Sequence, residues 1–252
     1  MNTATKNTAK KRTVSVIVPA FNEAELIGET LKAINEATKG RHEHFEVVVV
    51  NDSSTDETKA IAESAGAKVV DVELRNIGAV RNAGAKFASG EYLIFVDADT
   101  IIPPETLAAT VEALNAGALG GGASVSLESV PIPWYKYWLF PLMKTIWQSM
   151  GGWAAGCYMY CRAEVFEQID GFPEEYFAAE ELFFSRKIKA LGKFVLLPES
   201  VITSSRKFHD YSIWSLLGFV AVPLLSGPTG TFKSQRGLEI LYRHREESAE
   251  NT

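Results

Sequence analysis

Short apolar runs alternate with helical patterns along much of the chain. An apolar run bounded by turn residues predicts a buried strand, and apolar residues at helical spacing, such as Ile27, Leu31 and Ile34, predict a helix. Ser54 and Glu57 have the spacing of a capping box, which predicts the start of another helix. Strands that alternate with helices favour a parallel sheet covered on both faces. The predicted strands are Val14–Pro19, Phe45–Val50, Lys68–Val72, Tyr92–Val96 and Phe194–Leu197, and Gly78–Ala88 is a further predicted helix.

Polar side chains gather where the predicted strands end. Asp52 comes shortly after Val50, and Asp97 directly follows Val96. The carboxyl ends of parallel strands meet at one edge of the sheet, which is where open α/β sheets bind ligands. We therefore expect one site that is lined from several loops, with Asn22, Glu23, Asp52, Asp97 and Asp99 as its members.

The segment Asp97-Ala98-Asp99 carries two carboxylates one residue apart at the end of an apolar strand. Carboxylates so close together repel each other unless a cation lies between them, and a hard divalent ion is the usual partner. The pair therefore predicts half of a metal site for Mn²⁺ or Mg²⁺. The alternative is a solvated turn, because Asp is a common turn residue.

This pair is one of several motifs that follow one another along the chain. They are Pro19-Ala20-Phe21-Asn22-Glu23, Asn51-Asp52-Ser53-Ser54-Thr55-Asp56, Arg75-Asn76-x-Gly78-x-x-Arg81-Asn82, Asp97-Ala98-Asp99, Arg162-Ala163-Glu164-Val165-Phe166, Asp170-Gly171-Phe172 and Glu180-Glu181-Leu182. From about Val14 to Arg206, the chain resembles the family 2 glycosyltransferases. The resemblance implies the GT-A fold, an α/β domain with a single Rossmann-like, mixed and mainly parallel sheet flanked by helices. It also implies inverting sugar transfer from a UDP- or GDP-sugar to an acceptor hydroxyl, with a divalent metal.

The resemblance implies roles on the donor side. Asp99 is expected to bind the metal directly, and Asp97 to contact the ribose or reach the metal through water. Asp52 is expected to accept hydrogen bonds from the base. Arg81 is expected to face phosphate or sugar near the positive end of its helix, with a surface ion pair as the alternative. The other expected donor-binding residues are Pro19, Ala20, Asn22, Glu23 and Ala98, of which Pro19, Ala20 and Glu23 wall the base pocket.

Glu180 and Glu181 stand where the family has its acidic catalytic pair. The acceptor hydroxyl loses its proton as it attacks, so a carboxylate is needed opposite the leaving group. Glu181 is the expected base, with Glu180 turned toward the acceptor or toward Glu181. The family usually has Glu-Asp here with another acid two residues on, whereas this chain has a second glutamate and then Phe183. Two solvated acids at a helix N-terminus are the alternative.

A short basic stretch follows the last predicted strand and contains Arg206, Lys207 and His209. It resembles a subset of the family in which a basic pair faces the diphosphate, so Arg206 is expected to bind the donor. His209 is a candidate third metal ligand, and a structural histidine is the alternative.

Composition narrows the function classes. A chain of 252 residues is long enough for one large α/β domain, and its net charge of -6 argues against a nucleic-acid partner. Cys157 and Cys161 do not suggest a disulfide framework, and no histidine spacing supports zinc.

We expect a flexible basic tail at 1–13, a GT-A domain at 14–232 and a C-terminal tail at 233–252. Within the domain, 14–126 is the expected nucleotide-sugar-binding half and 127–232 the acceptor-side half. The polar tail lacks the apolar core of a signal peptide, which predicts a cytoplasmic protein.

Two segments raise the question of membrane contact. Residues 134–147 are rich in aromatic residues with interleaved lysines, and residues 211–232 carry no charge. Both are too short or too broken for the roughly 20 apolar residues that span a bilayer. The composition predicts peripheral contact with the inner face of the membrane and a lipid-linked or amphiphilic acceptor. The alternative is that both segments cover the core or shape the acceptor pocket.

Other function classes are less well supported by the sequence. A nucleotidyltransferase needs a glycine-rich, basic phosphate loop after its first strand, and a Rossmann dehydrogenase needs GxGxxG there. The segment Pro19 to Glu23 has neither. A nucleotide-sugar-binding protein without transferase activity is the alternative outside the enzymes, because Glu181 and Phe183 depart from the usual pattern.

Overall fold

The computed structural model describes residues 12–127, 152–176 and 180–204. In chain order, the helices and strands are β1 (Thr13–Ala20), α1 (Ile27–Thr38), β2 (His44–Asp52), α2 (Thr58–Ser64), β3 (Lys68–Val72), α3 (Ile77–Phe87), β4 (Tyr92–Val96), β5 (Thr100–Ile101), α4 (Pro104–Asn115), β6 (Gly120–Leu127), β7 (Tyr158–Arg162), α6 (Ala163–Gln168), α7 (Glu180–Leu191) and β8 (Phe194–Thr203).

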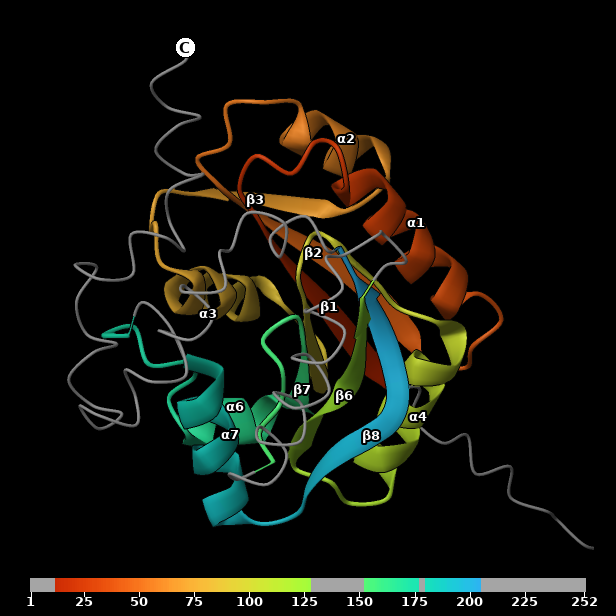
Figure 1. Cartoon of the computed structure of the whole chain (residues 1–252), viewed down its shortest axis with the longest axis vertical. Helices are drawn as coiled ribbons and strands as arrows, with labels where there is room; N and C mark the ends of the chain where they lie inside the picture. Colours follow the sequence, from red (N-terminus) through yellow and green to blue (C-terminus); the bar gives the residue numbers. More distant parts are fainter. Residues whose placement is uncertain (1–11, 128–151, 177–179, 205–252) are drawn as a thin grey trace, which may run out of the picture.

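The described strands form one sheet in the order β3-β2-β1-β4-β7-β6-β8-β5 (Figure 1). Strand β1 pairs in parallel with β2 and β4, β2 with β3, and β6 with β8. Strand β7 runs antiparallel to both β4 and β6, and β5 antiparallel to β8. The mixed, mainly parallel sheet that the sequence predicted is therefore confirmed.

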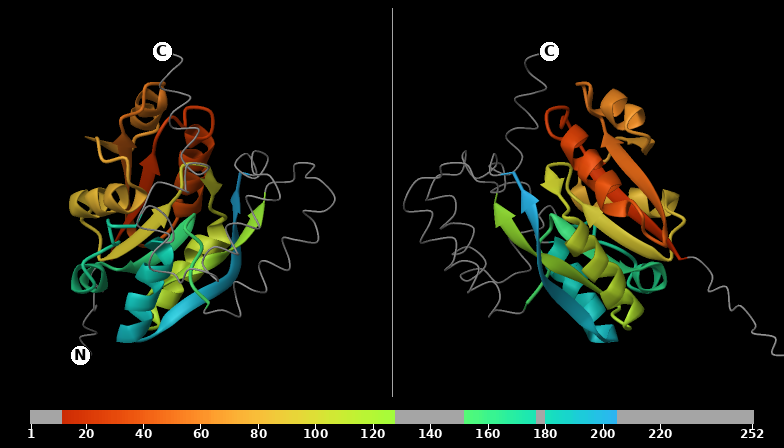
Figure 2. Two further views of the ribbon diagram at one scale, coloured as in Figure 1. Left: turned by 60° about the vertical axis from the view of Figure 1, so that its left-hand side comes forward. Right: turned by 90° about the vertical axis from the view of Figure 1, so that its right-hand side faces the viewer.

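Helices cover both faces of the sheet, as the alternation of apolar side chains along each strand requires. Val16 and Val18 point into a core with α1 and α4, whereas Ile17 points into a second core with α3, α6 and α7. In the right-hand view of Figure 2, α1 and α4 lie in front of the sheet. No helix among the described residues has the length and apolar character to cross a bilayer.

Helix α3 packs unusually close to β1 and β2, and Gly84 makes this possible. A Cβ at Gly84 would lie 2.8 Å from Cγ2 of Val50 and would also collide with Ile17. The close approach brings the buried face of α3, which includes Arg81 and Asn82, to the region beside the carboxyl end of β4.

Candidate active site

The order of the strands makes the end of β4 the candidate ligand site. The chain passes from β1 outward to β2 and β3 and then returns to β4 on the other side of β1. In open α/β sheets the crevice at such a reversal is the usual ligand site. Asp97 follows β4 directly, and its backbone N–H donates to the Cys157 carbonyl at 3.1 Å. The predicted carboxylate pair therefore lies at the predicted edge.

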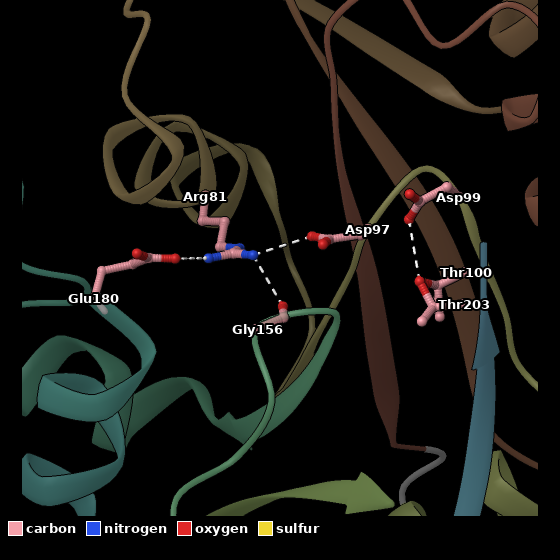
Figure 3. A network of polar contacts seen from close by, with 7 residues as sticks. All are labelled: Arg81, Asp97, Asp99, Thr100, Gly156, Glu180 and Thr203. Carbon is pink, nitrogen blue, oxygen red and sulfur yellow. Dashed lines mark hydrogen bonds and ion pairs between the residues drawn. The ribbon is translucent and has the colours of Figure 1, made fainter. Parts of the chain in front are cut away.

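Asp97 is held by a buried arginine (Figure 3). Arg81 donates from Nη2 to Oδ1 of Asp97 at 3.0 Å and to the Gly156 carbonyl at 2.9 Å. From Nη1 it donates to Oε1 of Glu180 at 2.5 Å. Burial works against the charged guanidinium, but the carboxylates of Asp97 and Glu180, with Glu181, outweigh burial and raise the pKa of Arg81. The structure thus joins a residue predicted for the metal site to one of the predicted catalytic pair.

Asp99 makes different contacts from Asp97, although only Ala98 separates them. The hydroxyls of Thr100 and Thr203 donate to Oδ1 of Asp99 at 3.4 and 3.5 Å, both long hydrogen bonds. The backbone N–H of Ser204 donates to the Asp99 carbonyl at 3.1 Å. Figure 3 shows Asp99 near Thr203 of β8, whereas Asp97 is turned to Arg81. The end of β8 therefore forms part of the surroundings of Asp99.

The oxygen atoms of Asp99 and of the hydroxyls beside it suit a hard divalent cation as metal ligands. They are carboxylate and hydroxyl oxygens, which Mg²⁺ and Mn²⁺ prefer over nitrogen or sulfur. Within the described ranges, no group of three or more His, Cys, Asp or Glu side chains could hold a metal. Mg²⁺ is commonly bound by one or two carboxylates together with substrate phosphates and water. The residues present therefore fit an ion that a bound diphosphate completes.

Backbone contacts join the loops after β1 and β2 at this edge. The Asn22 side chain accepts from Thr55 N–H at 2.8 Å, and Asn22 N–H donates to Ser54 Oγ at 3.0 Å. Glu23 N–H donates to Thr58 Oγ1 at 2.8 Å. The predicted Ser54–Glu57 capping box is wrong, because Glu57 is the N-cap of α2 and makes no side-chain cap hydrogen bond. Ser54 instead serves the contact between the two loops.

Asp52 organises the neighbouring loop after β3. Its Oδ1 accepts from Leu74 N–H at 2.8 Å and its Oδ2 from Arg75 N–H at 3.0 Å. Arg75 has a φ of 50°, and Asn22 and Ser53 have φ values of 50° and 62°. Non-glycine residues in this left-handed region are strained and gather at functional sites. Three loops at one edge of the sheet thus each hold such a residue.

Glu180, one of the predicted catalytic pair, lies on the opposite side of Arg81 from Asp97 (Figure 3). Glu180 and Glu181 begin α7, and the Glu180 side chain is 6% exposed. A Cβ on Gly156 would lie 3.7 Å from Nη2 of Arg81 and 3.9 Å from the carboxyl carbon of Glu181. Glu181 is therefore near the guanidinium as well. Burial, together with the charge of Glu180, raises the pKa of Glu181 to about 8.

The remaining predicted donor-site residues fall into two groups. Pro19 and Ala20 end β1 and are buried, paired with Val50 and Asn51 of β2, and Ala98 is buried between the two aspartates. Arg206 and His209, together with the segments 134–147 and 211–232, lie outside the described residues.

The model of the protein family described as Glycosyl transferase family 2 matches residues 15–169, which is more than half of the chain. The chain belongs to glycosyl transferase family 2. The undecaprenyl-phosphate 4-deoxy-4-formamido-L-arabinose transferase of Edwardsiella ictaluri is 36% identical over 111 residues, which are 41% of this chain and 34% of that protein.

Two solved structures resemble this family 2 chain in fold. TarS of Staphylococcus aureus in complex with UDP-GlcNAc has a TM-score of 0.62 at 24% identity, covering 86% of this chain and 67% of that one. The mannosyltransferase PcManGT of Pyrobaculum calidifontis, in complex with GDP-Man and Mn²⁺, also has a TM-score of 0.62 at 24% identity, covering 87% and 66%. The GT-A fold expected from the sequence is confirmed. The chain spans about a third of the length of the Edwardsiella transferase.

The sequence assigned no role at this family 2 site to Gly156 or Thr203, although Gly156 begins the segment to Phe172 that resembles the acceptor side of the family. Gly156 and Thr203 enter the site through a backbone carbonyl and a hydroxyl, and neither belongs to the motifs around the carboxylates. The structure also contains a cavity of about 1210 Å³ between the end of α3, the start of β4 and α6. Among the described residues, neither the two aspartates Asp97 and Asp99 nor the two glutamates of α7 line it. Gly90 and Tyr92 mark the amino end of β4, and the aspartates follow its opposite end.

Proposed function

We propose that the protein is an inverting glycosyltransferase that moves a sugar from a nucleotide-diphosphate donor to an acceptor hydroxyl. One observation supports this most strongly: Arg81 joins the carboxylate of Asp97 at the end of β4 to that of Glu180 at the start of α7. One of the two candidate metal-binding aspartates and one of the two candidate catalytic glutamates therefore belong to the same polar network. Membership of the family supports the same reaction.

The donor would lie at the carboxyl edge of β1, β2 and β4. Pro19, Ala20 and Glu23 wall the base there, with Asn22 holding the two loops together. Asp52 accepts two backbone N–H groups, so its contribution includes fixing the loop of Leu74 and Arg75 beside the base. Ala98 is a proposed donor-site residue on sequence grounds. Arg206 is a proposed diphosphate ligand on sequence grounds.

Asp99 is the proposed direct metal ligand and Asp97 the weaker candidate. Asp97 already pairs with Arg81, whereas Asp99 lies beside the hydroxyl oxygens of Thr100 and Thr203. His209 is a third candidate on sequence grounds. A bound Mn²⁺ or Mg²⁺ would act as a Lewis acid on the departing diphosphate. The Mn²⁺ in the PcManGT complex is consistent with this choice.

Glu181 is the proposed base. As the acceptor oxygen forms its bond to the anomeric carbon, the bond from that carbon to the diphosphate oxygen breaks. The hydroxyl proton goes to the Glu181 carboxylate, and the nucleoside diphosphate leaves with the electron pair of the broken bond. A single attack from the side opposite the leaving group inverts the anomeric centre. The raised pKa of Glu181 makes its carboxylate a stronger base than an ordinary glutamate.

The proposed acceptor is a lipid-linked or otherwise amphiphilic molecule reached at the inner face of the membrane. The name of the Edwardsiella relative refers to undecaprenyl phosphate, and the aromatic segment 134–147 has the composition of an interfacial belt. Flotation with anionic liposomes at low and high salt tests the membrane part. We expect co-flotation that weakens at high salt, and a chain that stays with the soluble fraction at low salt rejects it.

A panel of UDP- and GDP-sugars tests the reaction itself. Each is incubated with the protein in Mn²⁺ or in EDTA, and the melting temperature and the slow release of UDP or GDP by hydrolysis are measured. A ligand that binds the folded state stabilises it by RT ln(1 + L/Kd), where L is the free ligand concentration, and so raises the melting temperature. We expect one sugar class to stabilise the protein and be hydrolysed, both only with metal. Stabilisation without hydrolysis or transfer would identify a nucleotide-sugar-binding protein instead.

A further inference from the structure

The position of Arg81 is not the one expected of a residue that binds the nucleotide-sugar donor. Its side chain is 3% exposed, and the guanidinium lies over the ring of Phe172, with Cζ 5.4 Å from the ring centroid. Its Nε is enclosed and has no hydrogen-bond partner among the described residues. Its Nη1 donates to Glu180, and its Nη2 donates to Asp97 and to the Gly156 carbonyl. Little of the side chain is left to face a sugar or a phosphate.

We propose that Arg81 is a positioning residue that sets the catalytic glutamates relative to the Asp97 end of the site. This rests on the proposed function. The guanidinium is a rigid planar group whose two ends point to Glu180 on one side and to Asp97 and Gly156 on the other. The three partners come from α7, the end of β4 and the loop before β7. One side chain therefore fixes the relative placement of three segments that are remote in sequence.

Two other side chains of the same region support this role of α3. Asn76 donates from Nδ2 to the carbonyls of Glu174 at 3.0 Å and Tyr176 at 3.3 Å. Asn82 donates to the Phe172 carbonyl and accepts from Phe172 N–H, both at 2.9 Å. These bonds hold Phe172 to Tyr176, the stretch that leads toward Glu180. Arg81 and the two asparagines thus hold the acceptor-side carboxylates against the donor-side half.

The charges explain why an arginine is needed. The Glu180 side chain is 6% exposed and that of Asp97 is 25% exposed, so removing the cation leaves at least one buried carboxylate without its charge partner. A lysine would keep the charge but could not reach along both directions at once. Small displacements of a base matter, because an error of about 1 Å can cost a factor of roughly 10² in rate.

The test compares Arg81→Lys with Arg12→Lys. Arg12 is an exposed arginine that pairs with Glu91 at a distance of 3.2 Å, and it directly precedes β1, at the opposite end of that strand from the site. The assay is hydrolysis of the UDP- or GDP-sugar found by the panel, because water as acceptor removes acceptor binding from the comparison. The affinity for UDP or GDP with Mn²⁺ is measured separately by calorimetry. We expect Arg81→Lys to lower kcat by about 10²-fold and to change nucleotide affinity by less than about tenfold, and Arg12→Lys to change neither. A loss of affinity that matches the loss of turnover would make Arg81 a donor ligand and overturn the proposal.

A double-mutant cycle with Glu180→Gln separates positioning from general destabilisation. If Arg81 acts through Glu180, Arg81→Lys costs much less turnover in the Glu180→Gln background than in the natural protein. Additive losses overturn the proposal. The pH at which kcat/KM levels off should also rise in Arg81→Lys, because the best-placed cation beside Glu181 has moved away. A variant that is only less stable would leave the pH at which kcat/KM levels off unchanged.

Two cases are distinguished from the expected result: a variant that does not fold, and a natural protein that hydrolyses no nucleotide sugar. If Arg81→Lys does not fold, Glu180→Gln alone decides: a fall in kcat of tenfold or more at constant nucleotide affinity supports the proposal, and unchanged kcat rejects it. If the natural protein hydrolyses no nucleotide sugar, the proposed function fails. Activity in the natural protein with full activity in Arg81→Lys rejects the role of Arg81 alone.

Discussion

The ring of Phe183 is stacked on the ring of Tyr176, with the centroids 4.1 Å apart and the planes inclined by 18°. Phe183 stands at the position where the family resemblance leads us to expect a further acid. Here an aromatic contact ties the beginning of α7 to Tyr176, whose carbonyl is held by Asn76. The stack therefore helps to fix the part of α7 that carries Glu181. The departure from the usual pattern has a packing role.

Phe183→Ala should test this role. Loss of the stack and of the buried ring area should lower the free energy of unfolding by roughly 1–3 kcal/mol, measured by urea denaturation. Hydrolysis of the nucleotide sugar should slow several-fold, while affinity for UDP or GDP stays the same. Phe87→Ala is the control, since Phe87 is 48% exposed and should cost less than about 1 kcal/mol. Equal stability losses for the two variants would contradict the packing role.

Asp99→Asn should remove the metal dependence of nucleotide binding. The substitution takes away one charged oxygen ligand while keeping the shape of the side chain, so UDP or GDP should raise the melting temperature no more in Mn²⁺ than in EDTA. Removing one of two neighbouring like charges should leave the stability of the unliganded protein within about 1 kcal/mol. Asp71→Asn serves as the control, because Asp71 is an exposed partner of Lys59. A full Mn²⁺-dependent shift in Asp99→Asn argues against Asp99 as the ligand.

The sheet and its ligand-binding edge could be predicted because their signals are local. The apolar runs at Val14, Phe45 and Tyr92 form strands at the predicted places, and the carboxylates that follow them meet at one edge. Strand β6 was not predicted, since it begins with Gly120, Gly121 and Gly122, and glycine disfavours strands. These glycines are needed because of close packing. A Cβ on Gly121 would lie 2.6 Å from Cζ of Tyr160.

The surroundings of Arg81 could not be predicted for a different reason. The motif places it near the start of a helix, and a residue there was expected to face the donor. Its burial comes from the packing of α7 and of the loop at Gly156, which lie far away in sequence. Neither the periodicity nor the residue spacing within α3 indicates those contacts. The Ser54–Glu57 error has a similar origin, since a contact to Asn22 in another loop took the place of a local cap.

Glu181→Gln should separate catalysis from binding. Glutamine keeps the size of the side chain but cannot take a proton, so turnover should fall by about 10² to 10⁴-fold. Affinity for UDP or GDP with Mn²⁺ should change by no more than a few-fold, because the proposed nucleotide site is built from the loops after β1, β2 and β4, whereas Glu181 belongs to α7. Glu181→Asp, which has the side chain usual in the family, should retain more activity than Glu181→Gln. Near-normal turnover in Glu181→Gln would remove Glu181 from the mechanism.

The raised pKa of Glu181 should also appear in the pH dependence of stability. In the folded protein this carboxyl titrates near pH 8, whereas in the unfolded chain it titrates near its ordinary value of 4.5. Between these values the folded state holds a proton that the unfolded state has lost, so the contribution of Glu181 to stability is complete below about pH 4.5 and declines as the pH rises to about 8. Urea denaturation of the unliganded protein from pH 5 to 9, compared with Glu181→Gln, isolates this contribution. We expect the difference in unfolding free energy between the two proteins to shift in favour of Glu181→Gln as the pH rises, and to level off above pH 8. A difference that is constant across this range would show that Glu181 is ionised in the folded protein throughout.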